Sequence, residues 1–245
     1  MKKVIANILI LATILSLAAC GATSQQLSSD EGEATPAPVE TEAVKADADA
    51  DEPAVSEDAS AAETENEPEP SHIMVVYFSR TGEQYNVGVI DKGNTAIVAE
   101  MIGEATGADL YEILPEDDHY PMTYDELTDI ALEEQKDGAR PAIAGELPDL
   151  DGYDTIFIGA PVWWGDWPMI LYTFFESTPL EGKTLIPFST HEGSGLSGFD
   201  RSLAAACPDC TVADGLAVRG ADAQNDPEKV KASVSAWLDD LGLLG

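Results

Sequence analysis

The chain has 245 residues, a length that allows one or two domains, and 44% of them are hydrophobic, which excludes disorder along its whole length. Its 46 Asp and Glu residues against 12 Lys and Arg give a formal net charge of −34. This balance excludes a nucleic-acid-binding protein, because contacts with phosphates require clustered cations.

The first twenty residues have the pattern of an export signal. Two Lys residues precede an apolar run at 4–19, and the segment closes with Leu-Ala-Ala-Cys20. This ending resembles a bacterial lipoprotein box, in which the signal peptidase cuts before the Cys and its sulfur carries a diacylglycerol. We therefore expect a lipid anchor at Cys20 that holds the protein on the extracytoplasmic face of the cell membrane. An ordinary secretory signal with an incidental Cys is the alternative.

Residues 21–70 are expected to form a disordered acidic linker. They hold 15 acidic residues and one basic residue, Lys45, and they contain five Pro residues and no aromatic residue. Such a segment cannot bury enough apolar surface to offset the entropy lost on ordering. Asp47, Asp49 and Asp51 superficially resemble a calcium loop, but Glu52 stands where the sharp turn needs Gly. We therefore assign no metal site.

Residues 71–245 are expected to form the folded domain, with 31 acidic and nine basic residues and a net charge of −22. We predict strands at 73–78, 109–114, 155–159, 184–188 and 211–218, and helices at 94–106, 124–135, 168–175, 199–206 and 227–241. This alternation predicts an α/β fold, a doubly wound five-stranded parallel sheet with helices on both faces. Ligands of such sheets bind outside the carboxyl ends of the strands, so the loops after the first, third and fourth strands are the candidate site.

The loop after the first predicted strand offers donors for a phosphate. Its relevant residues are Ser79, Thr81 and Gly82 before an insertion at 83–92, and Asn94 and Thr95 at the start of the following helix. Hydroxyl groups, a Gly and a free helix N-terminus together suit an anion. A simple capped start of a helix is the alternative interpretation.

The loop after the third predicted strand is rich in tryptophan. Pro161 and Val162 are followed by Trp163-Trp164-Gly165-Asp166-Trp167. Large flat side chains at the end of a buried strand suit stacking on a planar ligand ring. We expect at least one of the three Trp residues to lie under the loop as part of the core.

The loop after the fourth predicted strand is rich in glycine, with Thr190, His191, Glu192, Gly193, Ser194 and Gly195 in succession. Its glycines allow the backbone to approach a ligand closely. His191 beside Glu192 also fits an acid–base pair. Neighbours in sequence on a loop need not face one site, however, so we assign no catalytic side chain.

Together the three loops resemble those of the bacterial flavodoxin-like family, over residues 72–243. The resemblance implies FMN as the cofactor, with its phosphate at Ser79, Thr81, Gly82, Asn94 and Thr95. It implies a ring site formed by Pro161, Val162, Trp163, Trp164 and Gly165, and by Thr190, His191, Glu192, Gly193, Ser194 and Gly195. It also implies a peptide near Gly165 that can flip its carbonyl toward the reduced ring. The insertion at 83–92 and the export signal depart from simple flavodoxins.

The expected function is FMN-dependent electron transfer with a redox partner protein or a small-molecule acceptor. One alternative is an FMN reductase that takes hydride from NAD(P)H and acts on quinones or similar acceptors. Another is a cofactor-free binding module that has kept only the fold. Cys207 and Cys210 have the spacing of a redox dithiol, but they follow a predicted helix instead of opening one, so a structural disulfide is favoured.

Overall fold

The computed structural model of the protein describes residues 72–244. The expected signal at 1–20 with Cys20, and the acidic linker at 21–70, lie outside these residues. Among residues 72–244, no helix is both long enough and apolar enough to cross a membrane.

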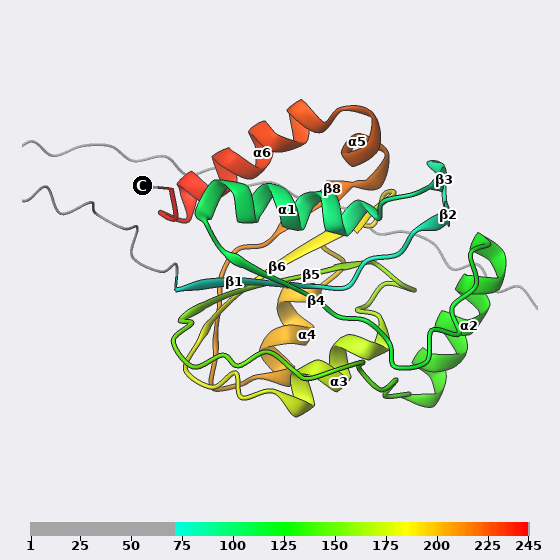
Figure 1. Cartoon of the computed structure of the whole chain (residues 1–245), viewed down its shortest axis with the longest axis horizontal. Coiled ribbons are helices and arrows are strands. Elements are labelled where there is room, and N and C mark those ends of the chain that lie inside the picture. Colours follow the sequence, from blue (N-terminus) through cyan, green and yellow to red (C-terminus); the bar gives the residue numbers. More distant parts are fainter. Residues whose placement is uncertain (1–71, 245) are drawn as a thin grey trace, which may run out of the picture. The chain divides into compact units, whose positions relative to one another are not determined.

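A six-stranded parallel sheet forms the centre of the domain (Figure 1). Its strands are β1 Ile73–Tyr77, β4 Asp109–Glu112, β5 Thr155–Pro161, β6 Thr184–His191, β7 Thr211–Val212 and β8 Leu216–Arg219. Five of them follow the order β4-β1-β5-β6-β7, and β8 also pairs with β6. The winding reverses between β1 and β5, which makes a switch point at the carboxyl ends of these strands. The predicted doubly wound α/β fold is confirmed.

Helices cover both faces of the sheet (Figure 1). On one face lie α1 Asn94–Thr106, α5 Gly220–Asn225 and α6 Pro227–Asp240, and on the other lie α3 Met169–Ser177 and α4 Phe199–Ala206. The remaining helix, α2 Tyr124–Asp137, lies beyond the carboxyl ends of the strands. Only the short α5 was absent from the prediction.

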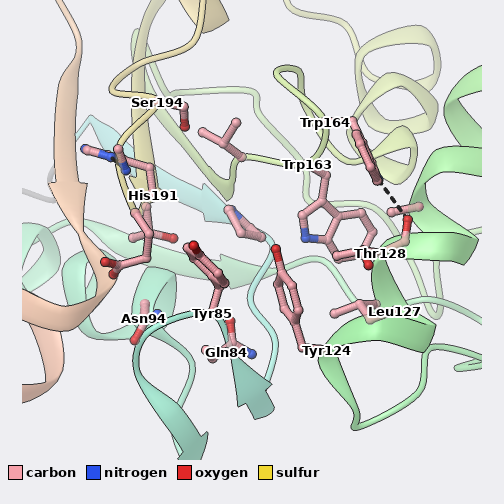
Figure 2. A pocket seen from close by; sticks show the side chains of 16 residues that line it. Gln84, Tyr85, Asn94, Tyr124, Leu127, Thr128, Trp163, Trp164, His191 and Ser194 are labelled. Carbon is pink, nitrogen blue, oxygen red and sulfur yellow. Dashed lines mark hydrogen bonds between the residues drawn. The ribbon is translucent and has the colours of Figure 1, made fainter.

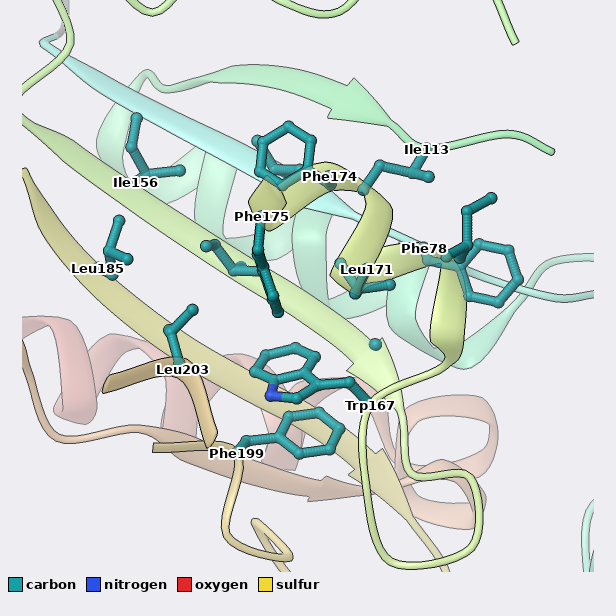
Figure 3. Close-up of a cluster of buried hydrophobic side chains, with 14 of the residues drawn as sticks. Phe78, Ile113, Ile156, Trp167, Leu171, Phe174, Phe175, Leu185, Phe199 and Leu203 are labelled. Atoms are coloured by element: carbon teal, nitrogen blue, oxygen red, sulfur yellow. The ribbon is translucent and has the colours of Figure 1, made fainter. Parts of the chain in front are cut away.

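Two hydrophobic clusters hold these layers together, one on each face. In β1, Met74 and Val76 join the α3–α4 cluster, whereas Val75 and Tyr77 join the α1–α6 cluster. Successive side chains of a strand point to opposite faces, so a strand between two cores is apolar on both. Figure 3 shows the first cluster.

The single strand predicted at 211–218 is wrong, because β7 and β8 are separated by residues 213–215. The carbonyl of Leu185 in β6 accepts the N–H of Ala213 at 3.0 Å. Pro187 lies two residues further along β6, so its backbone is directed toward the same neighbouring strand as that of Leu185. Pro187 has no N–H to donate to that strand. The ladder is therefore interrupted opposite Pro187, where a Cβ on Gly215 would lie 2.6 Å from the Pro187 carbonyl oxygen.

The insertion at 83–92 folds into an antiparallel hairpin of β2 Gly82–Gln84 and β3 Gly88–Ile90. The N–H of Glu83 donates to the carbonyl of Met122 at 2.8 Å, and the Glu83 carboxylate accepts the N–H of Tyr124 at 3.0 Å. Glu83 thus satisfies a backbone donor in the first turn of α2, whose N-cap Thr123 makes no side-chain cap hydrogen bond. The hairpin is fastened to α2.

Two further segments differ from, or add to, the sequence prediction. The fourth strand, β6, continues to His191, so Thr190 and His191 end a strand instead of lying in a loop. Between α4 and β7, Cys207 and Cys210 are joined in a disulfide.

Candidate functional site

A cavity of about 620 Å³ lies at the carboxyl ends of β5 and β6, and its volume is typical of cofactor sites. Ten of the residues predicted for cofactor binding line it: Asn94, Pro161, Val162, Trp163, Trp164, Thr190, His191, Glu192, Gly193 and Ser194. The other six, Ser79, Thr81, Gly82, Thr95, Gly165 and Gly195, do not. Of these, Ser79 and Thr81 line a second hollow of about 250 Å³ beside the start of α1.

The start of α1 presents backbone donors without partners. Its N-cap, Gly93, makes no side-chain cap hydrogen bond, while Ser79 Oγ accepts the N–H of Ala96 at 3.1 Å. Within residues 72–244, the N–H groups of Asn94 and Thr95 donate to no acceptor. A Cβ at Gly93 would collide with Ser79 Oγ, so Gly is needed where this loop crosses the helix start. Such free donors at a helix N-terminus favour an anion.

The side chains of Asn94 and Thr95 are engaged inside the protein. Thr95 is 1% exposed, and its hydroxyl shares a hydrogen bond of 2.8 Å with the hydroxyl of Thr190. The carboxamide oxygen of Asn94 accepts from Gln224 Nε2 at 2.8 Å. Thr95 therefore offers an anion its backbone N–H and not its hydroxyl, whereas Asn94 offers its backbone N–H and the amide nitrogen of its side chain.

A tight turn presents the first two Trp residues to the cavity. Trp163 and Asp166 exchange both backbone hydrogen bonds at 3.0 Å, and the two residues between them have positive φ, +50° at Trp164 and +81° at Gly165. This pattern is a type I′ turn, which Gly165 adopts freely and Trp164 does not. The Trp164 indole donates from Nε1 to the carbonyl of Thr128 on α2 at 2.8 Å (Figure 2), and this hydrogen bond helps to offset the strain of the positive φ.

The three Trp residues of this turn have different environments. Trp163 packs edge-on against Phe78, with ring centroids 5.5 Å apart, and lines the cavity. Trp164 is 53% exposed, whereas Trp167 is 1% exposed and stacks on Phe199 with centroids 3.6 Å apart (Figure 3). Trp167 is thus the core residue expected among the three.

His191 and Glu192 line the cavity but do not bond to each other. His191 Nδ1 accepts the N–H of Gly193 at 2.9 Å, and burial lowers the pKa of the imidazole. The Glu192 carboxylate accepts the N–H of Ala221 at 2.7 Å and pairs with Arg219 at 3.2 Å. The acid–base interpretation of these two residues therefore has no support in their contacts.

Sequence reasoning missed one wall of the cavity. It consists of Gln84 and Tyr85 from the hairpin and of Tyr124, Leu127, Thr128 and Ala131 from α2. The four α2 residues are spaced as one helical face, a signal visible in the sequence. What the sequence did not indicate is that α2 lies across the carboxyl ends of the strands.

Behind Trp163, a polar cluster around the buried Glu134 joins α2 to the segment before it. The Glu134 carboxylate, 8% exposed, accepts the hydroxyl of Tyr120 at 3.1 Å and lies 3.2 Å from His119 Nε2. Burial raises the pKa of Glu134, and a hydrogen bond to the Asp117 carbonyl, followed by Glu134 itself, raises the pKa of His119. The Tyr120 ring contacts Trp163 edge-on at 5.2 Å, so this cluster supports the cavity wall.

Comparisons with known proteins agree with this fold. The flavodoxin family model matches residues 72–237. A candidate flavoprotein of known structure from Bacteroides eggerthii is 32% identical, with a TM-score of 0.55, over 69% of this chain and 97% of that one. Another from Bacteroides uniformis is 30% identical, with a TM-score of 0.56, over 70% and 99%.

A flavoprotein from Lactobacillus acidophilus, solved in complex with FMN, is 23% identical over 63% of this chain and 96% of that one, with a TM-score of 0.48. Comparison with curated proteins gives no match.

Proposed function

Because the chain belongs to the flavodoxin family, its cofactor is FMN, and we propose that the domain is an electron carrier. The observation that carries the proposal is the state of the ionisable groups at the cavity. His191 is bound to Gly193, and Glu192 is bound to Ala221 and Arg219. The described lining offers aromatic walls but no free acid–base pair, which suits electron exchange without proton-transfer catalysis by the protein.

The residues present fit FMN. The unpaired N–H groups of Asn94 and Thr95 suit its phosphate, and the indoles of Trp163 and Trp164 suit its ring. When bound, FMN supplies a ring that accepts and donates one or two electrons. The protein would hold the phosphate through the backbone N–H groups of Asn94 and Thr95 and would limit access of water to the ring with aromatic side chains, while burial lowers the pKa of His191 beside the ring site.

A reductive titration of the FMN-loaded protein, followed by absorbance, tests the carrier function. A carrier takes up its two electrons in two separate steps and reacts slowly with NADH and NADPH in a stopped-flow experiment. One two-electron step with fast oxidation of NADH would contradict it and favour a reductase. A colourless chain that takes up no flavin in a titration would contradict both and leave the cofactor-free binding module.

A reductase of small acceptors is the second candidate function. It is favoured by the wall that α2 and the hairpin add to the cavity, because a reductase needs a pocket for its acceptor over the ring. The electron donor of such an enzyme is a nicotinamide nucleotide. The same stopped-flow experiment, with a quinone as acceptor, separates the two functions.

The carrier is proposed to work at the outer face of the membrane, held there by a lipid on Cys20. The support is the Leu-Ala-Ala-Cys20 sequence after an apolar run and the acidic residues of 21–70 that separate it from the domain. Cys20→Ser should release the protein from membranes or leave its signal uncleaved. Unchanged membrane association together with unchanged electrophoretic mobility would contradict the lipid anchor.

A further inference from the structure

The cavity has a second aromatic wall that belongs to none of the three loops predicted for the cofactor. Tyr85 on the hairpin lies against Tyr124 on α2, with ring centroids 5.5 Å apart and planes tilted by 30°. Figure 2 shows both rings reaching into the space that the Trp163 indole also borders. Leu127 and Ala131 extend this surface along α2.

Tyr85 is 54% exposed, and the hairpin that carries it is attached to α2. Glu83, two residues before it, makes the backbone hydrogen bond to Met122 and accepts the N–H of Tyr124. The same α2 holds the opposite rim through the Trp164–Thr128 hydrogen bond. An exposed aromatic side chain held at the mouth of a cavity indicates a binding surface.

The chemistry of this wall selects an uncharged ligand. Its polar groups, the Gln84 carboxamide and the Thr128 hydroxyl, are neutral, and no Lys or Arg is among the described residues that line the cavity. Asp125 and Glu126 occupy the first turn of α2. These carboxylates disfavour a negatively charged group against this wall, away from the α1 donors proposed for the FMN phosphate, whereas a neutral planar ring gains stacking contacts with the two tyrosines.

We propose that Tyr85 and Tyr124 form a binding subsite for a neutral planar aromatic molecule of the quinone class, beside the ring of FMN. The inference rests on the proposed FMN site and names the acceptor that the second candidate function requires. The subsite exists because the insertion at 83–92 folds back onto α2.

Equilibrium dialysis of the full chain, loaded with FMN and with no reductant present, measures the binding of 2-methyl-1,4-naphthoquinone. The variants are Tyr85→Ala, Tyr85→Phe and the matched control Val89→Ala, which removes an exposed side chain from the same hairpin but outside the cavity lining. In parallel, quenching of flavin fluorescence measures the Kd of FMN for each chain without cofactor. Circular dichroism checks that each variant is folded.

Tyr85→Ala should raise the Kd of the quinone roughly fivefold, the effect of losing one aromatic contact, while Tyr85→Phe and Val89→Ala bind as the parent does. The Kd of FMN should be the same in all four chains. Unchanged quinone binding by Tyr85→Ala would overturn the subsite. A matching loss of FMN affinity would also overturn it, because the wall would then belong to FMN. Quinone binding that depends on Tyr85 in a chain that takes up no FMN would support the subsite and overturn the proposed function.

Discussion

Neighbouring residues of one type have separate roles in the tryptophan turn. Trp164 is fixed to α2 by its indole N–H and borders the cavity, while Trp167, three residues later, is covered by Phe199 and Phe175. The sequence shows three equivalent aromatic residues, because composition does not indicate which side chain a type I′ turn directs inward. Substitutions at the two positions should therefore affect different properties.

Trp164→Ala should weaken FMN binding by about 1 kcal/mol through the loss of one stacking contact, with little change in stability. Trp167→Ala should lower the free energy of unfolding by roughly 3–5 kcal/mol, because it empties a buried site. Flavin fluorescence titration and urea unfolding measure the two quantities. Equal effects of both substitutions on unfolding would show that the turn acts as one packing unit.

Protonation of the polar cluster behind Trp163 should make stability depend on pH. His119 and Glu134 both have raised pKa values in the folded protein. A group whose pKa is higher in the folded than in the unfolded protein stabilises the fold fully at pH values below its unfolded pKa, which is about 6.5 for His119. This stabilisation is lost as pH rises through the folded pKa. The free energy of unfolding should therefore fall as pH rises from about 6.5 through the folded pKa of His119.

Glu134→Gln tests the source of this pH dependence. It removes the carboxylate that helps to raise the pKa of His119, so urea unfolding should give a smaller fall over the same pH range. Asp129→Asn removes a charge from an exposed position of the same helix and serves as the control. The same slope in both variants would exclude the cluster as its cause.

At the scale of elements, the sequence predicted what depends on local apolar patterns. The five predicted strand regions and the helices between them follow from periodicity, and all but the fifth strand are found as single strands. The break opposite Pro187 was not predictable, since it depends on which strand Pro187 faces. The hairpin was also missed, because residues 82–90 are too short and polar to indicate strands.

The attachment of the hairpin to α2 should contribute measurably to the free energy of unfolding. Glu83→Ala removes the carboxylate that accepts the Tyr124 N–H in the first turn of α2. The free energy of unfolding should fall by about 1 kcal/mol, as it does when a helix cap is lost. Asp129→Ala removes an equal charge from the middle of the helix and should have a smaller effect. Equal losses would attribute the effect to net charge alone.

At the scale of the whole molecule, the charge of the domain bears on the reduction of its cofactor. Adding electrons near carboxylates is disfavoured, so reduction of FMN is expected at low potential. Glu192 lines the cavity, whereas the Asp166 carboxylate is bound to the Tyr172 hydroxyl at 3.0 Å and lies outside the lining. Glu192 should therefore lower the reduction potential of FMN more than Asp166 does.

Glu192→Gln should raise the midpoint potential of bound FMN, and Asp166→Asn should change it less, in a spectroelectrochemical titration. Added salt should raise the potential of the parent chain, because it screens the distant surface carboxylates. An equal shift in both variants would mean that the potential depends on the net charge of the protein and not on the distance of each carboxylate from the ring.

The two attachments of α2 also bear on how long a molecule stays in the cavity. Glu83 holds the start of this helix, and the Thr128 carbonyl holds the Trp164 indole further along it. We expect the residence time of a bound ligand to depend on the rate at which these contacts open as well as on the strength of its own contacts. At the proposed location on the outer face of a membrane, a released flavin would diffuse away, so slow release would keep more copies of the protein loaded with FMN.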